Sequence, residues 1–200
     1  MKYFTQLKAA LFFASLLPLL RLGWLGYFSQ LGANPIEFIT RSLGTWTLVF
    51  LLLTLCVTPL RHLSGWLWLI KLRRMVGLFA FFYALLHFIT YIWLDQFFDL
   101  NAMVKDVIKR PFITIGFAAF ILLLPLAITS NNAMIKKLGG KNWQRIHRLI
   151  YIIAILAVLH YWWLVKKDVS QPLVYAVLLG VLLAYRIWFA LSKRRAKRTD

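Results

Sequence analysis

Two histidines of this 200-residue sequence lie inside otherwise apolar stretches, in two short segments of similar composition. His87 stands in Leu-His-Phe (86–88) and His160 in Leu-His-Tyr (159–161). An imidazole in a membrane-spanning segment is costly without a partner, so each is a candidate functional residue. Neutral imidazoles are good axial ligands for haem iron. Two of them on different helices therefore predict a bis-imidazole haem site.

The two histidines are expected at nearly the same depth. His87 lies twelve residues after Met75, about 18 Å along a helix, and His160 lies thirteen residues after His147, about 20 Å. The simpler interpretation is that each imidazole only hydrogen-bonds to a neighbouring helix, as polar residues in membranes often do. Equal depth on two helices favours the haem.

His147 is a third candidate ligand, placed near the inner surface. On a straight helix its face lies about 140° from that of His160. The matching depth on the other helix holds Arg73 and Arg74, which are not iron ligands, so an inner site lacks a second ligand. A capping or lipid-headgroup role for His147 stays open. His62, in a basic loop, is interpreted as a solvated or headgroup-facing residue.

The composition places the chain in the integral-membrane class. Hydrophobic residues make up 62% of it and the mean hydropathy is +0.73. A spanning helix takes about 20 residues, so six spans use nearly all of the chain and leave no room for a soluble nucleotide-binding domain. We predict an all-α bundle of six transmembrane helices in a single domain, 1–200, with core helices at about 44–165 and the haem between the third and fifth. The expected spans are 9–28, 44–60, 75–94, 111–129, 146–165 and 172–191.

The formal charge of +18 indicates membrane orientation rather than nucleic-acid binding, because the basic residues cluster in short loops. Sixteen Lys and Arg residues lie at the N-terminus and in 61–74, 136–148 and 193–198, against six in the alternate loops. Both termini are therefore predicted in the cytoplasm, with the basic tail on anionic lipid. Arg21 is the exception, a cation that either snorkels to the outer surface or binds an acidic group.

Other chemistries are disfavoured by what the spans lack. All six acidic residues fall in loops, at a helix end or at the C-terminus, which argues against a proton relay or paired-carboxylate catalysis. The single Cys56 lies in a span and offers no disulfide or Cys-x-x-Cys pair. We interpret it as a packing residue.

Several motifs together resemble the ferric-reductase-like transmembrane group, and within it the MsrQ (formerly YedZ) family of bacterial haem-binding membrane subunits. They are RRMVGL at 73–78, ALLH at 84–87, KRPF at 109–112, LAITS at 126–130, WQRIHRLIY at 143–151 and HY at 160–161, with LGANP at 31–35. The resemblance covers nearly the whole chain.

This resemblance implies haem b, with His87, His147 and His160 as its histidines, and also FMN. It implies that electrons pass from the quinone pool or a cytoplasmic flavin reductase to MsrP, a periplasmic molybdopterin enzyme that reduces methionine sulfoxide in oxidised proteins. The location it implies is the bacterial inner membrane, in contact with lipid and not with nucleic acid. The chain itself is not expected to act on methionine sulfoxide.

Two other functions are kept as alternatives. One is a self-standing metalloreductase that reduces ferric or cupric ions at the outer face; the expected lack of a flavin and nicotinamide domain counts against it. The other is a haem-free transporter or scaffold, which the lack of carboxylates inside the spans disfavours.

Overall fold

The computed structural model describes residues 2–165 and 168–199, with side chains for 3–165, 168–193 and 195. Every regular element in these ranges is helical, and six helical stretches are long and apolar enough to cross a membrane. The predicted all-α fold with six spans is thereby confirmed. The α-helices are α1 (Lys2–Tyr27), α2 (Pro35–Ser64), α3 (Arg73–Thr90), α4 (Leu100–Lys109), α5 (Pro111–Ile128), α6 (Asn132–His147), α7 (Leu149–Leu164) and α8 (Ser170–Thr199).

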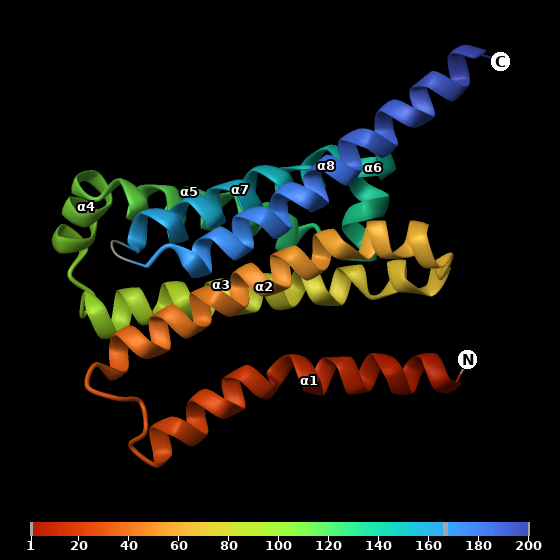
Figure 1. Ribbon diagram of the computed structural model, residues 1–200. Helices are drawn as coiled ribbons and strands as arrows, with labels where there is room; N and C mark the ends of the chain where they lie inside the picture. Colours follow the sequence, from red (N-terminus) through yellow and green to blue (C-terminus); the bar gives the residue numbers. More distant parts are fainter. Residues whose placement is uncertain (1, 166–167, 200) are drawn as a thin grey trace.

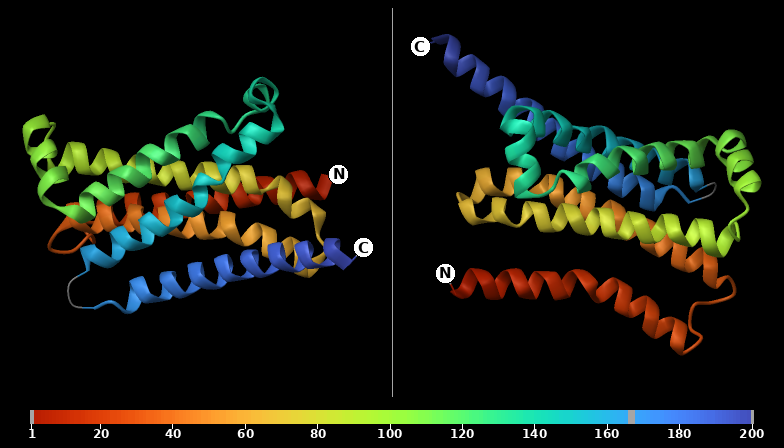
Figure 2. Two further views of the ribbon diagram at one scale, coloured as in Figure 1. Left: turned by 90° about the horizontal axis from the view of Figure 1, so that it is seen from above. Right: turned by 180° about the vertical axis from the view of Figure 1, so that it is seen from behind.

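The spanning helices run side by side, and the two ends of the bundle differ (Figure 1). One end, here called the terminal end, holds the start of α1, the close of α8, the α2–α3 connection and α6. The other, the α4 end, holds the α1–α2 connection and α4, which crosses the bundle direction (Figures 1 and 2). All acidic residues that the structure describes lie at the α4 end: Glu37, Asp95, Asp99, Asp106 and Asp168. The predicted orientation would place the terminal end in the cytoplasm.

The core is formed where α2 packs on α3 and where α5 packs on α7. Tyr83 and Leu55 are fully buried, and the Tyr83 ring stacks on Phe50 with 5.2 Å between ring centres. Ala80 and Ala154 are also fully buried. Small residues at such positions let helix backbones approach closely, and this close packing helps helices to associate in membranes.

α1 lies at the edge of the bundle and buries only a narrow stripe that includes Ser15 and Leu22. A hydrogen bond anchors this stripe: the Tyr83 hydroxyl on α3 donates to the Ser15 carbonyl oxygen at 2.7 Å. The bond is buried and links residues far apart in the sequence, so it fixes the register of α1 against the core.

Replacing Tyr83 with phenylalanine should lower the free energy of unfolding by about 1 kcal/mol, since a buried hydrogen bond is lost while the ring still packs. Thermal unfolding in detergent, followed by circular dichroism, measures the change. Tyr175→Phe is the matched control, because the structure gives the Tyr175 hydroxyl no hydrogen-bond partner among the described residues. Equal unfolding temperatures for the two variants would contradict the anchoring role of Tyr83.

The bounds of the second span differ from those expected. α2 begins at Pro35, where Asn34 caps it by accepting the Glu37 backbone N–H at 3.2 Å. The span predicted at 44–60 is therefore longer at both ends, because α2 also continues through Pro59 to Ser64. It ends at Gly65, whose φ of 72° is the left-handed conformation that glycine adopts most readily.

The fifth span agrees with the prediction of one helix over 146–165. α6 and α7 together form one candidate spanning stretch, Asn132–Leu164, and Arg148 between them keeps helical dihedral angles, with a φ of −71° and a ψ of −19°. α6 itself bends at Gly139, which has a φ of 74°. The helix α4 was not expected, because residues 95–110 were interpreted as a connection between two spans. Its N-cap is Asp99, which accepts the Ala102 backbone N–H at 3.0 Å.

Candidate functional site

The imidazoles of His87 and His160 lie next to each other in the structure. His87 is near the close of α3 and His160 near the close of α7, both toward the α4 end, and their ring centres are 6.2 Å apart at an interplanar angle of 76°. A metal–imidazole bond is about 2 Å long and a ligating nitrogen lies about 1 Å from its ring centre, so two imidazoles flanking one metal ion have centres about 6 Å apart. The observed spacing fits that arrangement.

Each imidazole is held by a hydrogen bond to a backbone carbonyl of the helix beside it. His87 Nδ1 lies 2.8 Å from the Thr40 oxygen of α2, and His160 Nδ1 lies 2.7 Å from the Phe112 oxygen of α5. A carbonyl oxygen only accepts, so the proton of each neutral ring is on Nδ1. The Nε2 lone pair of both rings is then available to a metal ion, the tautomer that metal-binding histidines commonly use.

A glycine beside each ring gives it room to reach the carbonyl. A Cβ on Gly116 of α5 would lie 2.7 Å from His160 Nδ1, and a Cβ on Gly44 of α2 would lie 3.1 Å from His87 Cε1. Each glycine stands four residues after the carbonyl that accepts the hydrogen bond, Thr40 or Phe112. Close approach to a helix backbone is possible only without a side chain at these positions.

The surroundings of the pair are largely aromatic. Phe88 of α3 stacks on Phe120 of α5 with 4.5 Å between ring centres, and the Phe112 ring lies 6.3 Å from that of His160. Polar side chains also lie beside His87: the Thr40 hydroxyl donates to Thr90 Oγ1 at 3.3 Å. These apolar rings favour a hydrophobic, planar group over a hydrated ion.

The number of ligands narrows the kind of metal centre that the pair could form. No three His, Cys, Asp or Glu side chains gather into a metal cage anywhere in the described ranges 2–165 and 168–199. A bare zinc ion takes at least three protein ligands, whereas haem iron takes only axial ones. The residues present therefore fit a haem.

The structure does not bring His147 to this pair. Its ring stacks on Trp143 with 3.9 Å between ring centres, and its Nε2 lies 3.1 Å from Thr129 Oγ1. The Thr129 hydroxyl donates its only proton to the Pro125 carbonyl at 2.6 Å, so its oxygen accepts from His147 Nε2–H. In this arrangement His147 Nε2 carries a proton and cannot bind a metal ion.

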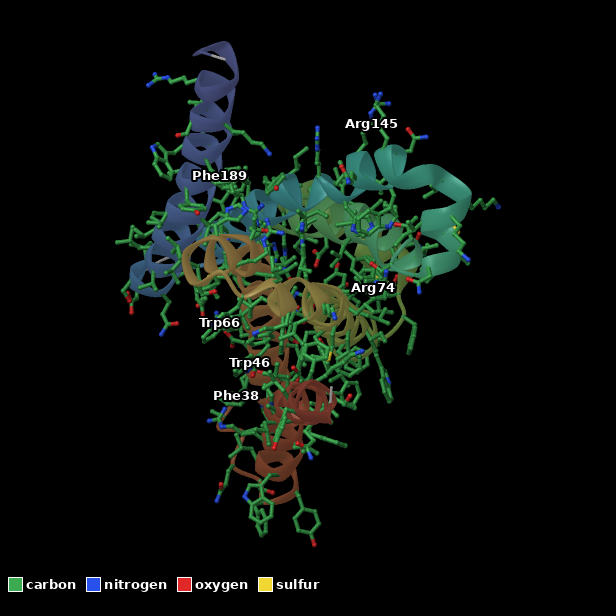
Figure 3. The ribbon with its side chains drawn as sticks, turned by 90° about the vertical axis from the view of Figure 1, so that its right-hand side faces the viewer. Phe38, Trp46, Trp66, Arg74, Arg145 and Phe189 are labelled. Carbon is green, nitrogen blue, oxygen red and sulfur yellow. The ribbon has the colours of Figure 1, made fainter. Side chains whose placement is uncertain are left out.

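The basic residues around His147 lie at the terminal end. Arg74 and Arg145 are seen there in Figure 3, which looks onto that end. Arg74 donates to Asn132 Oδ1 at 2.8 Å. His62 is also remote from the pair: its ring stacks on Phe189 of α8 with 4.1 Å between centres and is partly buried, rather than fully solvated.

The supporting residues of the pair were not identified from the sequence. Gly44 and Gly116 each stand alone inside an apolar helical stretch, which is a recognisable signal of close backbone approach. The accepting carbonyls of Thr40 and Phe112 carry no sequence signal, since any residue has one.

Comparison with known proteins defines the class of this chain. Residues 43–158 match the family described as the ferric reductase like transmembrane component. This range holds His87, His147 and both of the supporting glycines, and it ends two residues before His160.

Curated relatives are more specific. The chain is 60% identical to the protein-methionine-sulfoxide reductase heme-binding subunit MsrQ of Herminiimonas arsenicoxydans, over 95% of this chain and 88% of that protein. It is 56% identical to the MsrQ of Azospira oryzae, over 92% and 79%, and 53% identical to that of Rhodospirillum rubrum, over 96% and 92%. The chain therefore belongs to the MsrQ family, as the motifs of the sequence indicate.

Proposed function

We propose that this chain binds haem b between α3 and α7, where His87 and His160 would hold the iron, and that it carries electrons through the membrane. The observation that carries the proposal is the 6.2 Å spacing of two imidazoles whose Nδ1 atoms are both tied to carbonyls. The names of the relatives, which call them heme-binding subunits, support the same cofactor.

The chain's own residues would position and insulate this group. When bound, haem supplies the one-electron couple. The Thr40 and Phe112 carbonyls fix the tautomer and the orientation of the two rings, and such hydrogen bonds also raise the basicity of the ligating nitrogen. The surrounding phenylalanines keep the site dry, which together with the axial ligands sets the reduction potential.

His147 stays a predicted further ligand. The resemblance favours it, but its ring would have to turn away from Thr129 before Nε2 could bind iron. FMN likewise stays a prediction, because no motif of the sequence points to residues that hold it.

For the direction of electron flow, we propose the route that the resemblance implies. Electrons enter from the quinone pool or a cytoplasmic flavin reductase and leave to a periplasmic MsrP-like molybdopterin enzyme that repairs methionine sulfoxide. The relatives' name, a heme-binding subunit of a reductase, supports a separate catalytic partner. The histidine pair lies toward the α4 end, which faces the periplasm if both termini are in the cytoplasm of a bacterial inner membrane.

The match to the ferric reductase like family supports one alternative electron acceptor. This acceptor is ferric ion, which the chain would reduce without a partner protein. Proteoliposomes separate the two functions. A flavin reductase with NADH is enclosed, or a quinol is added to the bilayer, and either an MsrP-like enzyme with methionine sulfoxide or ferric citrate is supplied outside.

Consumption of methionine sulfoxide that needs both this chain and the MsrP-like enzyme is the expected result. Ferric citrate reduced at a comparable rate without that enzyme would instead support the metalloreductase. No electron transfer to either acceptor, by protein that holds haem, would contradict the proposed conduit.

A further inference from the structure

Arg21 is a cation in a spanning helix for which the haem site has no use. It lies six residues before the close of α1 at Tyr27, about 9 Å below that helix end, and its side chain is exposed. Among the described residues it has no hydrogen-bond or ion-pair partner. The nearby acid at the start of α2, Glu37, is already paired with Arg41. Because a charge at this depth is costly when unpaired, Arg21 calls for an anionic partner from outside the chain.

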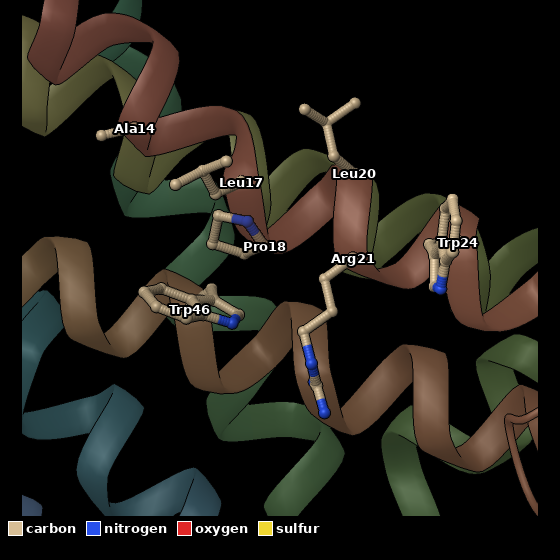
Figure 4. A pocket seen from close by; sticks show the side chains of 7 residues that line it. All are labelled: Ala14, Leu17, Pro18, Leu20, Arg21, Trp24 and Trp46. Atoms are coloured by element: carbon tan, nitrogen blue, oxygen red, sulfur yellow. The ribbon is translucent and has the colours of Figure 1, made fainter.

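A groove beside Arg21 provides the space for such a partner. It has a volume of about 540 Å³ and lies between α1 and α2. Its walls are residues of α1 between Ala14 and Trp24, and Trp46 of α2. Figure 4 shows the Arg21 side chain extending from α1 toward α2 along one side of this space. Apart from that guanidinium and the indole N–H groups, the lining side chains are apolar.

The lining changes along α1 in the order that a phospholipid requires. Trp24 and Arg21 lie toward the α4 end, at the depth where tryptophan rings meet headgroups. Leu17, Pro18 and Ala14 follow deeper in the bilayer, where an acyl chain would lie. A guanidinium is well suited to bind phosphate oxygens with two parallel hydrogen bonds.

We propose that this groove binds one anionic phospholipid, with its headgroup phosphate on Arg21 and an acyl chain against the apolar wall of α1. The bound lipid would hold α1 on α2, where the protein contacts of α1 are sparse. A quinol in the same groove is a less suitable occupant, because its oxidation releases protons and no lining side chain can accept them.

Native mass spectrometry of the delipidated, haem-loaded protein tests the proposal. Titration with phosphatidylglycerol and with zwitterionic phosphatidylethanolamine should show about tenfold tighter binding of the anionic lipid at one site, because the ammonium group of phosphatidylethanolamine offsets the phosphate charge that attracts Arg21. Arg21→Gln should abolish this preference, while Arg21→Lys should keep part of it. Arg41→Gln is the matched control, since Arg41 is an exposed arginine at the same end that already has an acidic partner.

The haem spectrum and circular dichroism of each variant report whether it is folded. Equal binding of the two lipids by the wild type, or a preference that survives Arg21→Gln in folded protein, would overturn the proposal. So would a neutral quinone that displaces phosphatidylglycerol from the wild type and binds Arg21→Gln equally well.

Discussion

Gly116→Ala is expected to abolish most haem binding while leaving the helices intact. The new Cβ would lie 2.7 Å from His160 Nδ1 and 2.8 Å from Cε1, so the ring must move off the Phe112 carbonyl. Loss of the groups that orient a ligand typically lowers metal affinity about 10- to 100-fold. Haem content per protein after purification, and titration of the apoprotein with haem, measure the effect.

Two other glycines make this a graded test. At Gly44 the nearest atom, His87 Cε1, is 3.1 Å away, so Gly44→Ala should weaken haem binding less than Gly116→Ala does. Gly180→Ala in α8 is the control, because a Cβ there meets nothing within 4 Å. Alanine also favours a helix over glycine by about 1 kcal/mol, which offsets part of the cost of displacing a ring, so all three apoproteins should show folded circular dichroism spectra. Equal haem content in all three variants would contradict the positioning role of the glycines.

His87→Ala and His160→Ala are expected to stop electron transfer in the proteoliposome assay, with a fall of at least about 100-fold in methionine sulfoxide consumed. Each would remove one of the two proposed haem ligands, and no nearby side chain in the described part of the chain could replace it. His62→Ala, at a histidine remote from the pair, is the control and should keep full activity.

Added imidazole distinguishes a lost ligand from a misfolded protein. It can enter the space that the alanine leaves and bind the iron, so it should restore part of the activity of His160→Ala. Activity retained by either variant without imidazole would contradict the assignment of that residue as a ligand.

The parts of this account that the sequence predicted are those that depend on hydrophobicity and helical rise. Six apolar stretches of about 20 residues each were enough to predict the six spans. A single segment in lipid can satisfy all of its backbone hydrogen bonds only by forming a helix. The equal depth of His87 and His160 followed from the constant rise of a helix, and in the structure their rings lie side by side.

The remaining features depend on tertiary contacts and could not be predicted in the same way. The continuation of α2 through Pro59 to Ser64 is one such feature, because a proline near the end of an apolar stretch usually ends a helix. Likewise, the Phe112 carbonyl contacts His160 only because α5 packs on α7. Which helices pack together cannot be predicted from the hydropathy of each helix alone. An isolated glycine such as Gly116 indicates a close approach to its helix, but only the structure shows that the approaching group is the His160 ring.

The measurement that tests the central claim most directly is a reduced-minus-oxidised absorption spectrum of the detergent-purified protein, taken beside His87→Ala and His160→Ala. The account predicts a low-spin b-type spectrum in the wild type that is lost in both variants, since one haem needs both imidazoles. A spectrum unchanged in either variant would contradict that ligand assignment. A folded wild-type protein that stays colourless when supplied with haem would contradict the electron-transfer function and favour a haem-free transporter or scaffold.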